Sequence, residues 1–445
     1  MNDLLITNAT LVNENLIRDA DIYVKNGRIE QIGTNLGHIA ASTTLDARGN
    51  ILMPGMIDDQ VHFREPGFTH KADIYSESRA AVAGGTTSYM EMPNCVPQTT
   101  TPEALAAKYT VAAEKSVANH AFYFGATNDN IEYIKALDPL SACGVKVFMG
   151  ASTGNMLVDN PETLEQIFRH SPVLIATHCE STPLIQANEA RYIDKYKGNV
   201  PVECHPEIRS VHACYESSSM AVALAKKHGS RLHVLHLTTE KELVLFEKGP
   251  VADKQITAEA CVHHLFFNST DYARLGNLIK CNPAIKRESD QKALIQAVID
   301  DKIDIIATDH APHTLEEKQQ PYLKAPAGLP LVQYALLSLL EHYHRGTFSL
   351  ELIVRKACHA PAIRYQVAER GFIREGYWAD LVLLNLNQPK IVKSEDVLSK
   401  CGWSPFEGYR FRSAIDTTIV NGNIVYQNGE VSDAYRGMPL TFNRS

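Results

Sequence analysis

The sequence predicts an α/β fold: a (β/α)8 TIM-type barrel that carries a small β-sandwich domain built from both chain termini. Eight strand-like runs alternate with helix-like runs through the middle of the chain, and hairpin-rich segments of similar texture lie at its two ends. Eight strand–helix units over roughly 300 residues match the number and size of such a barrel. A doubly wound sheet is the competing architecture, but it would not usually need eight units.

Both ends of the chain have the pattern of antiparallel strands. Asn26-Gly27 and Asn421-Gly422 each lie between alternating apolar residues, which is a strong hairpin signal. We therefore expect residues 1–53 and 365–445 to form one β domain and residues 54–364 to form the barrel. Two unrelated β appendages are the alternative.

The predicted barrel strands are short runs rich in Val, Ile, Thr and aromatic residues. Catalytic residues of such barrels lie at the C-terminal ends of the strands, so those ends hold the functional candidates. The eight runs are 57–63, 87–93, 120–126, 144–150, 172–178, 231–237, 255–261 and 303–309.

Composition and charge limit the classes of partner. The chain has 445 residues, 44% of them hydrophobic, and 43 basic against 51 acidic residues give a net charge of −8. This balance argues against nucleic-acid or anionic-membrane partners. No apolar run approaches the roughly 20 residues of a membrane span, and no basic leader opens the chain. Nine scattered cysteines without a Cys-x-x-Cys pair suit reduced thiols, so we expect a cytoplasmic protein acting on a small molecule, and leave a homodimer open.

The first barrel strand carries polar residues on one face. Gln60, His62 and Arg64 alternate with Val61 and Phe63, and side chains in a strand alternate between its two faces. A buried His and Arg cost free energy unless they meet a metal, an anion or a partner. The alternative is an edge strand whose polar face meets water.

Histidines recur at the ends of other predicted strands. His62, His178, His236 and Asp309 end strands one, five, six and eight, and they are suitable ligands for a borderline cation such as zinc. A single histidine at a strand end is more often packed or exposed than a ligand, but recurrence at four ends favours a metal site.

Lys146 lies inside an apolar run of the fourth strand, where an ammonium beside a cation would be repelled. A neutral lysine amine can add carbon dioxide and form a carbamate that binds metals as a carboxylate does. The alternative is that Lys146 points out of the barrel with its ammonium in water.

Several of these residues belong to motifs of a known family. The segment from Gly55 through Gly67, Met92-Pro93-Asn94, Cys281-Asn282-Pro283 and Asp309 through His313 together resemble the amidohydrolase superfamily, and within it the dihydroorotases. The resemblance runs nearly the whole chain, to the segment 400–408. It implies a metal-dependent cyclic amidase.

The resemblance also implies a metal set. One metal would take His62 and Asp309, another would take His178 and His236, and a carbamylated Lys146 would bridge them. Gln60 replaces the first histidine of the family's His-x-His motif, and an amide oxygen suits harder cations than zinc. We therefore expect zinc to be held firmly by His178, His236 and Lys146, and weakly or not at all at His62.

The implied reaction is the reversible hydrolysis of the dihydroorotate ring amide to N-carbamoyl-L-aspartate, the ring-closing step of pyrimidine biosynthesis. Metal-activated hydroxide would attack, with Asp309 as general acid and base. The implied substrate contacts are Arg64, Asn94 and His313 for the carboxylate, Asn282 for the ring, and Ala327 and Gly328 through their backbone. A structural ion pair for Arg64, and turn or loop capping for Asn94, Asn282 and His313, are the alternatives.

Two other functions stay open at this point. A related cyclic amidase, such as a hydantoinase, dihydropyrimidinase or allantoinase, would use the same chemistry on neutral rings, but Arg64-Glu65-Pro66-Gly67 favours a substrate with a carboxylate. A catalytically weak scaffold is supported only by Gln60. Glu259, His263 and His264 are expected to be structural, and Glu180 to orient His178.

Overall fold

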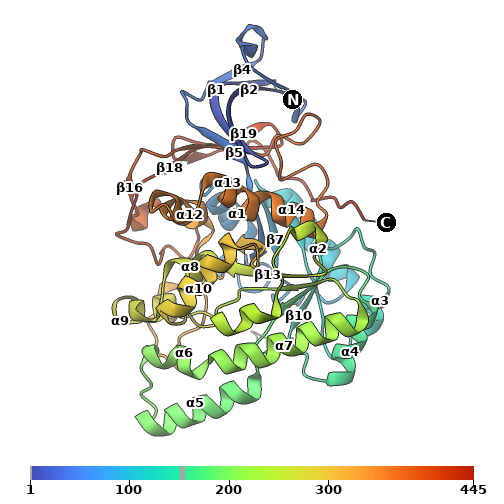
Figure 1. The fold of residues 1–445 in the computed structure, drawn as a ribbon, viewed down its shortest axis with the longest axis vertical. Coiled ribbons are helices and arrows are strands. Elements are labelled where there is room, and N and C mark those ends of the chain that lie inside the picture. The colour runs from blue at the N-terminus through green and yellow to red at the C-terminus, as the bar shows by residue number, and fades with distance from the viewer. Residues whose placement is uncertain (1–2, 151–155, 445) are drawn as a thin grey trace.

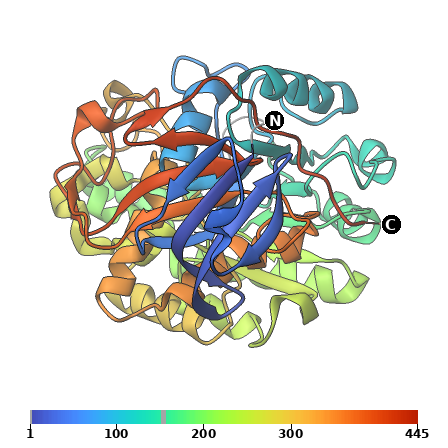
Figure 2. The ribbon, with the colours of Figure 1, turned by 90° about the horizontal axis from the view of Figure 1, so that it is seen from above.

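The computed structural model describes residues 3–150 and 156–444, and its strands separate into a barrel and a sheet built from both chain ends (Figure 1). The terminal sheet has nine strands in the order β20-β19-β18-β15-β5-β1-β2-β3, with β4 paired to β1. Figure 2 shows the blue N-terminal and red C-terminal strands side by side in this sheet. The two ends of the chain therefore share one sheet, and the alternative of two unrelated appendages is wrong.

The strands of this sheet are β1 (Leu4–Asn13), β2 (Leu16–Lys25), β3 (Arg28–Gly33), β4 (Thr43–Asp46), β5 (Ile51–Pro54), β15 (Leu381–Asn385), β18 (Ala414–Val420), β19 (Asn423–Gln427) and β20 (Glu430–Val431). A small ribbon of β16 (Lys390–Ile391) and β17 (Arg410–Phe411) lies beside it. Apolar side chains of the nine-stranded sheet form a separate buried cluster that includes Leu4, Ile22, Leu52 and Leu381. The exact limits of the two predicted domains stay predictions.

The barrel strands are parallel and follow the predicted runs. They are β6 (Met56–Val61), β7 (Thr86–Glu91), β8 (Asn119–Phe122) continued by β9 (Phe124–Gly125), β10 (Val145–Phe148), β11 (Ile175–His178), β12 (Leu232–Val234), β13 (Ile256–Cys261) and β14 (Ile305–Ala307). The ring closes between β14 and β6, where the amide of His62 donates to the carbonyl of His310 at 2.7 Å. The predicted barrel is confirmed.

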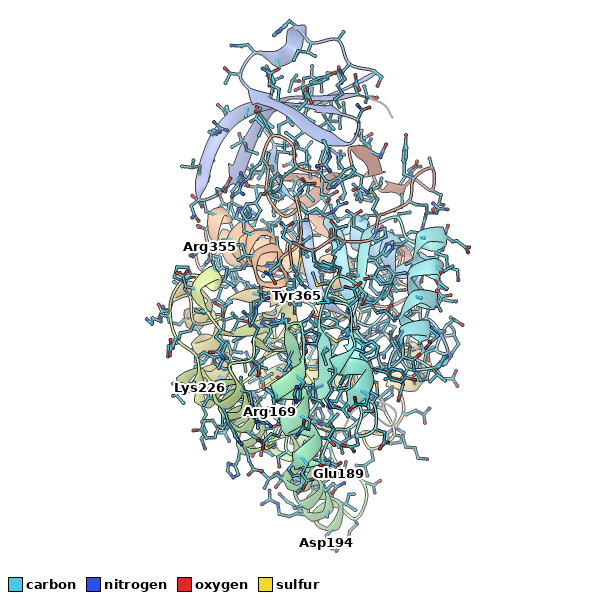
Figure 3. All side chains as sticks on the ribbon, turned by 90° about the vertical axis from the view of Figure 1, so that its right-hand side faces the viewer. Arg169, Glu189, Asp194, Lys226, Arg355 and Tyr365 are labelled. Atoms are coloured by element: carbon cyan, nitrogen blue, oxygen red, sulfur yellow. The ribbon has the colours of Figure 1, made fainter. Side chains whose placement is uncertain are left out.

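Helices follow the strands and cover the barrel (Figure 1). They are α1 (Ile74–Ala83), α2 (Pro102–Lys115), α3 (Ile131–Lys135), α4 (Pro161–His170), α5 (Thr182–Tyr196), α6 (His205–Ile208), α7 (Val211–His228), α8 (Val262–Phe266), α9 (Tyr272–Leu275), α10 (Glu288–Ile299), α11 (Leu315–Lys318), α12 (Ala335–His344), α13 (Leu350–Val354) and α14 (Ala360–Tyr365). Figure 3 places Glu189 and Asp194, on α5, at the end of the molecule opposite the terminal sheet. None of the described helices is both long and apolar enough to cross a membrane.

Gly55 joins the terminal sheet to the barrel, because it lies between β5 and β6. A Cβ atom at this position would lie 2.1 Å from Oγ1 of Thr87 on the neighbouring strand β7. Only glycine lets the two strands approach this closely. The same strand pair then carries the polar residues of β6 into the barrel.

Gly55→Ala is expected to lower the free energy of unfolding by about 1–3 kcal/mol, because the added methyl group overpacks against Thr87. Chemical denaturation measures the change. Gly37→Ala is the matched control, since no atom lies within 4 Å of a Cβ added there. Equal stability of the two variants would contradict the close-approach explanation.

Candidate functional site

A cavity of about 260 Å³ lies at the C-terminal ends of the barrel strands. It gathers residues from six strand ends and from the loop before α12, and all the predicted site residues except His313 line it. The lining residues are Gln60, His62, Arg64, Asn94, Lys146, Phe148, His178, Arg209, His236, Asn282, Asp309, Ala311, Ala327 and Gly328.

The backbone is strained at three of these positions. Arg64, His236 and Asp309 have φ values of 69°, 40° and 50°, in the left-handed region that residues other than glycine rarely adopt. Each lies two or three residues after the end of a barrel strand and lines the cavity. Such strain concentrates at functional sites, because the surrounding fold must hold it in place.

His178 and His236 form the first group of donor atoms. Nδ1 of His178 lies 3.0 Å from Nε2 of His236, while Nε2 of His178 donates to Glu180 at 3.0 Å. Burial lowers the pKa of both imidazoles, that of His236 well below its ordinary value, so both are neutral. Nδ1 of His236 is buried without a hydrogen-bond partner. Neutral ring nitrogens facing one another, with a carboxylate fixing one ring, are what a zinc site requires.

His62 and Asp309 form the second group. Nδ1 of His62 lies 2.8 Å from Oδ1 of Asn94 and must donate to it, which leaves Nε2 as a bare lone pair 3.1 Å from Oδ1 of Asp309. Burial lowers the pKa of His62, so the ring is neutral. Two lone pairs at this distance repel unless a cation lies between them, and the pair therefore also fits a metal ion.

Gln60 meets the same carboxylate. Its Nε2 donates to Oδ1 of Asp309 at 3.0 Å, and its Oε1 lies 3.8 Å from Sγ of Cys261. The amide therefore orients Asp309 as a hydrogen-bond donor. This arrangement agrees with the expectation that Gln60 is not a zinc ligand.

Lys146 points into the barrel and lines the cavity, so the alternative of an exterior ammonium is wrong. Its Nζ lies 4.7 Å from the ring centroid of Phe148. Burial lowers its pKa to about 8, which makes the neutral amine accessible near physiological pH. The structure thus supplies the amine that carbamate formation needs.

Arg64 is held at the cavity wall by protein groups. Its Nε donates to the carbonyl of Pro312 at 3.0 Å, and Nη2 lies 3.1 Å from Nε2 of His313. Burial lowers the pKa of Arg64 only to about 10, so the guanidinium stays charged. Trp403, from the C-terminal segment, also contacts this wall: its Nε1 donates to the carbonyl of His313 at 2.8 Å.

His313 lies behind Arg64 and outside the cavity lining. Nδ1 accepts from the Lys71 ammonium at 3.0 Å, which leaves Nε2 to donate to the carbonyl of Ala327 at 3.0 Å. Burial and the Arg64 charge keep its pKa well below the ordinary value. Lys71 and Ala327 therefore fix the His313 ring beside Arg64, while Nε2 of His313 has no lone pair for the guanidinium. Direct contact of His313 with a substrate stays a prediction.

The loop with Ala327 and Gly328 is fixed by a buried lysine. Nζ of Lys318 donates to the carbonyls of Lys280, Pro326 and Gly328 at 3.0, 2.9 and 2.9 Å. Gly328 has φ of 144°, and a Cβ there would lie 2.3 Å from the carbonyl oxygen of Ala311. This position accepts only glycine, and its backbone forms part of the cavity wall.

Arg209 is a lining residue that sequence reasoning missed. It follows α6, in the long connection after β11, and it forms an ion pair with Glu180, the carboxylate that orients His178. The Arg209 charge and the hydrogen bond to His178 hold the pKa of Glu180 far below its usual range despite burial. No strand-end pattern marks Arg209, because its loop reaches the site from outside the barrel.

Comparison with known proteins agrees with this geometry. The model of the amidohydrolase family matches residues 51–425. The chain belongs to the amidohydrolase family. As a member, it is a metal-dependent cyclic amidohydrolase, and the predicted resemblance to the superfamily is confirmed.

The proteins related to this chain are named for different substrates. A dihydroorotase of Methanothermobacter thermautotrophicus is 32% identical over 416 residues, 92% of each chain. An allantoinase of Bacillus velezensis is 30% identical over 433 residues, 96% of this chain and 94% of that protein. The structure of an L-hydantoinase (dihydropyrimidinase) from Arthrobacter aurescens superposes with a TM-score of 0.92 at 28% identity, over 99% of this chain and 100% of that chain. These comparisons agree on cyclic amide chemistry and differ in substrate.

Glu180→Gln is expected to weaken zinc binding by about 10- to 100-fold, because the amide no longer orients His178 as the carboxylate does. Chelator competition measures the zinc dissociation constant. Glu242→Gln is the matched control, a buried carboxylate that accepts hydrogen bonds from Ser218 and Thr239. Equal zinc affinity in both variants would show that Glu180 does not act on the metal site.

Proposed function

We propose that this amidohydrolase is a dihydroorotase, which interconverts dihydroorotate and N-carbamoyl-L-aspartate. The proposal rests on one observation: a buried guanidinium lines the cavity, and no carboxylate of the described residues forms an ion pair with it. Arg64 lines the cavity and is 5% exposed. Within residues 3–150 and 156–444, no Asp or Glu forms an ion pair with it.

A buried charge without a counter-ion is costly, and it is retained where a ligand supplies the opposite charge. Among the described residues, Arg64 donates to the carbonyl of Pro312 and lies beside the neutral ring of His313. A planar guanidinium in this state is suited to bind a carboxylate through two parallel hydrogen bonds. Dihydroorotate carries such a carboxylate on its ring, and the ring-opened N-carbamoyl-L-aspartate retains it, whereas hydantoin and dihydropyrimidine rings lack it.

Asn282 and Asn94 offer polar groups that complement a cyclic imide-like ring in the same cavity. Oδ1 of Asn282 is buried, lines the cavity and accepts no hydrogen bond from the described residues. A ring N–H is the complementary donor. Oδ1 of Asn94 is already engaged by His62, so its amide nitrogen is the group left for an oxygen of the substrate.

The candidate metal donors line the same cavity. His178, His236 and a carbamylated Lys146 would hold zinc, with His62 and Asp309 as donors for a second ion. When bound, such an ion lowers the pKa of water and polarises the ring carbonyl. Glu180 fixes the His178 ring through Nε2, and Phe148 shields Lys146 from solvent.

Asp309 is placed to move the proton. Burial raises the pKa of Asp309, but the polar and charged side chains around it, Lys146 among them, outweigh burial and lower the pKa, so the carboxylate is ionised. Oδ1 accepts from Gln60 and faces Nε2 of His62, which leaves Oδ2 as the oxygen able to accept a proton. Asp309 would then deliver this proton to the ring nitrogen during hydrolysis and remove it during ring closure.

The proposed contact between Arg64 and the substrate carboxylate is tested by measuring the kinetics of wild type and Arg64→Ala with dihydroorotate and with hydantoin. Wild type is expected to prefer dihydroorotate in kcat/KM. Arg64→Ala should raise KM for dihydroorotate on the order of 10- to 100-fold, the loss of a charged hydrogen-bonded pair. Hydantoin is the internal control, because a neutral ring gains nothing from Arg64. Faster turnover of hydantoin than of dihydroorotate by wild type would contradict the proposal.

Asp309→Asn should reduce kcat by at least about 10²-fold while the far-UV circular dichroism is unchanged, because an amide cannot accept the proton. Zinc content must be measured alongside activity, since Asp309 is also a metal donor. Near-wild-type kcat in this variant would mean that another group moves the proton.

A further inference from the structure

A second group of metal-binding side chains lies inside the barrel, separate from the cavity. Asp59 on β6, His233 on β12 and Glu259 on β13 have no exposed surface. Their donor atoms all lie within 4.8 Å of one another. None of the three lines the cavity, and the mechanism above uses none of them.

A register irregularity brings Asp59 into this position. The pairing of β6 with β7 shifts between Asp58 and Val61, so strict alternation of faces fails at Asp59 and Gln60. The strands β6 and β12 are not neighbours in the barrel, so Asp59 reaches His233 across the interior. Tyr123 holds the bulge by donating to the carbonyl of Asp59 at 2.9 Å.

Four atoms of this group accept or donate no hydrogen bond within the part of the chain that the structure describes. They are both carboxylate oxygens of Asp59, Nε2 of His233 and Oε2 of Glu259. A fully buried carboxylate without partners is among the most costly groups in a protein interior. The neighbouring buried Asp58 shows the contrast, because it accepts from Thr308 Oγ1 at 2.6 Å and from two backbone amides.

The other polar atoms of the group are already oriented. Nδ1 of His233 lies 2.8 Å from Oγ1 of Thr257, whose own hydrogen is directed to the carbonyl of Leu232. Nδ1 therefore carries a ring proton, and in the neutral ring Nε2 presents its lone pair to the two carboxylates. Oε1 of Glu259 accepts from the backbone amide of His236 at 3.1 Å, which leaves Oε2 free. Such outer partners are typical of metal-ligating side chains.

The spacing also fits a cation better than direct hydrogen bonds. Nε2 of His233 lies 3.3 Å from Oδ2 of Asp59 and 3.5 Å from Oε2 of Glu259. Charge-assisted N–H···O bonds are shorter, about 2.7–2.9 Å. Ligands on a tetrahedral zinc ion, with bonds of about 2.0–2.2 Å, lie about 3.3–3.5 Å apart.

We propose that Asp59, His233 and Glu259 bind a structural zinc ion inside the barrel, beneath the catalytic cavity. One oxygen of Asp59, Nε2 of His233 and Oε2 of Glu259 would supply three donors to the ion. The ion would cross-link β6 to β12 and β13 just below Gln60 and His236. Tyr365, labelled near the middle of the molecule in Figure 3, packs edge-on against His233 and seals this region.

Anomalous diffraction from crystals of the wild-type protein, grown without chelator, tests the site directly. Data above and below the zinc edge should show a peak among these three side chains, distinct from any peak at His178 and His236. No peak at Asp59 in crystals whose catalytic ligands do show zinc would overturn the proposal and leave an imidazolium ion pair in its place. The outcome does not depend on which substrate the enzyme turns over.

Metal counting on variants gives a second, independent measurement. Asp59→Asn should contain about one zinc equivalent less per chain than wild type, and its melting temperature should no longer respond to added zinc. Asp58→Asn is the matched control, and it should keep the wild-type zinc count. Equal zinc content in the two folded variants would contradict the proposal. If Asp59→Asn does not fold, the anomalous measurement on wild type decides.

Discussion

Burial of charged side chains inside the barrel is the constraint on which the rest of the structure depends. Most of these charges have partners within the chain: Lys108 pairs with Glu91 at 2.8 Å, and His310 with Glu77 at 2.8 Å. Glu77 also accepts from Ser399, which ties the C-terminal segment to the barrel. Each pair satisfies two groups that would be costly alone.

The exceptions mark the places where something outside the chain must complete the structure. Among the described residues, Arg64 forms no ion pair with a carboxylate, the lone pair of His62 faces Asp309, and Asp59 accepts no hydrogen bond and faces only His233. The first points to an anionic substrate, and the other two to metal ions. The same argument, that a buried charge needs a partner, therefore underlies the proposed substrate, the catalytic metal and the proposed structural zinc.

Sequence patterns were sufficient for the barrel and for the strand-end residues, because alternation and turn signals are local. They could not show that Lys146 faces inward, since the orientation of a strand is set by pairing with distant strands. Arg209 was missed because a loop outside the barrel delivers it to the site. The bulge at Asp59 was missed because it breaks the alternation on which the prediction rested. His313 lies outside the cavity lining, which sequence spacing does not reveal, and its contact with a substrate stays a prediction.

Gln60 connects the cavity with the buried group of Asp59, His233 and Glu259. Its amide nitrogen donates to Asp309, which lines the cavity. Its amide oxygen lies next to Cys261, whose thiol donates to Glu259 of the buried group at 3.3 Å. Gln60 thus orients Asp309, the carboxylate proposed to move the proton. Strand β6 also carries Asp59, so one strand contributes to both the cavity and the buried group.

The most direct test of this account is a crystal structure of the enzyme with N-carbamoyl-L-aspartate bound. The account predicts that a product carboxylate binds the guanidinium of Arg64 and that the carbamoyl nitrogen lies within hydrogen-bonding distance of Asp309. A product carboxylate bound elsewhere, with Arg64 still contacting only Pro312 and His313, would contradict it.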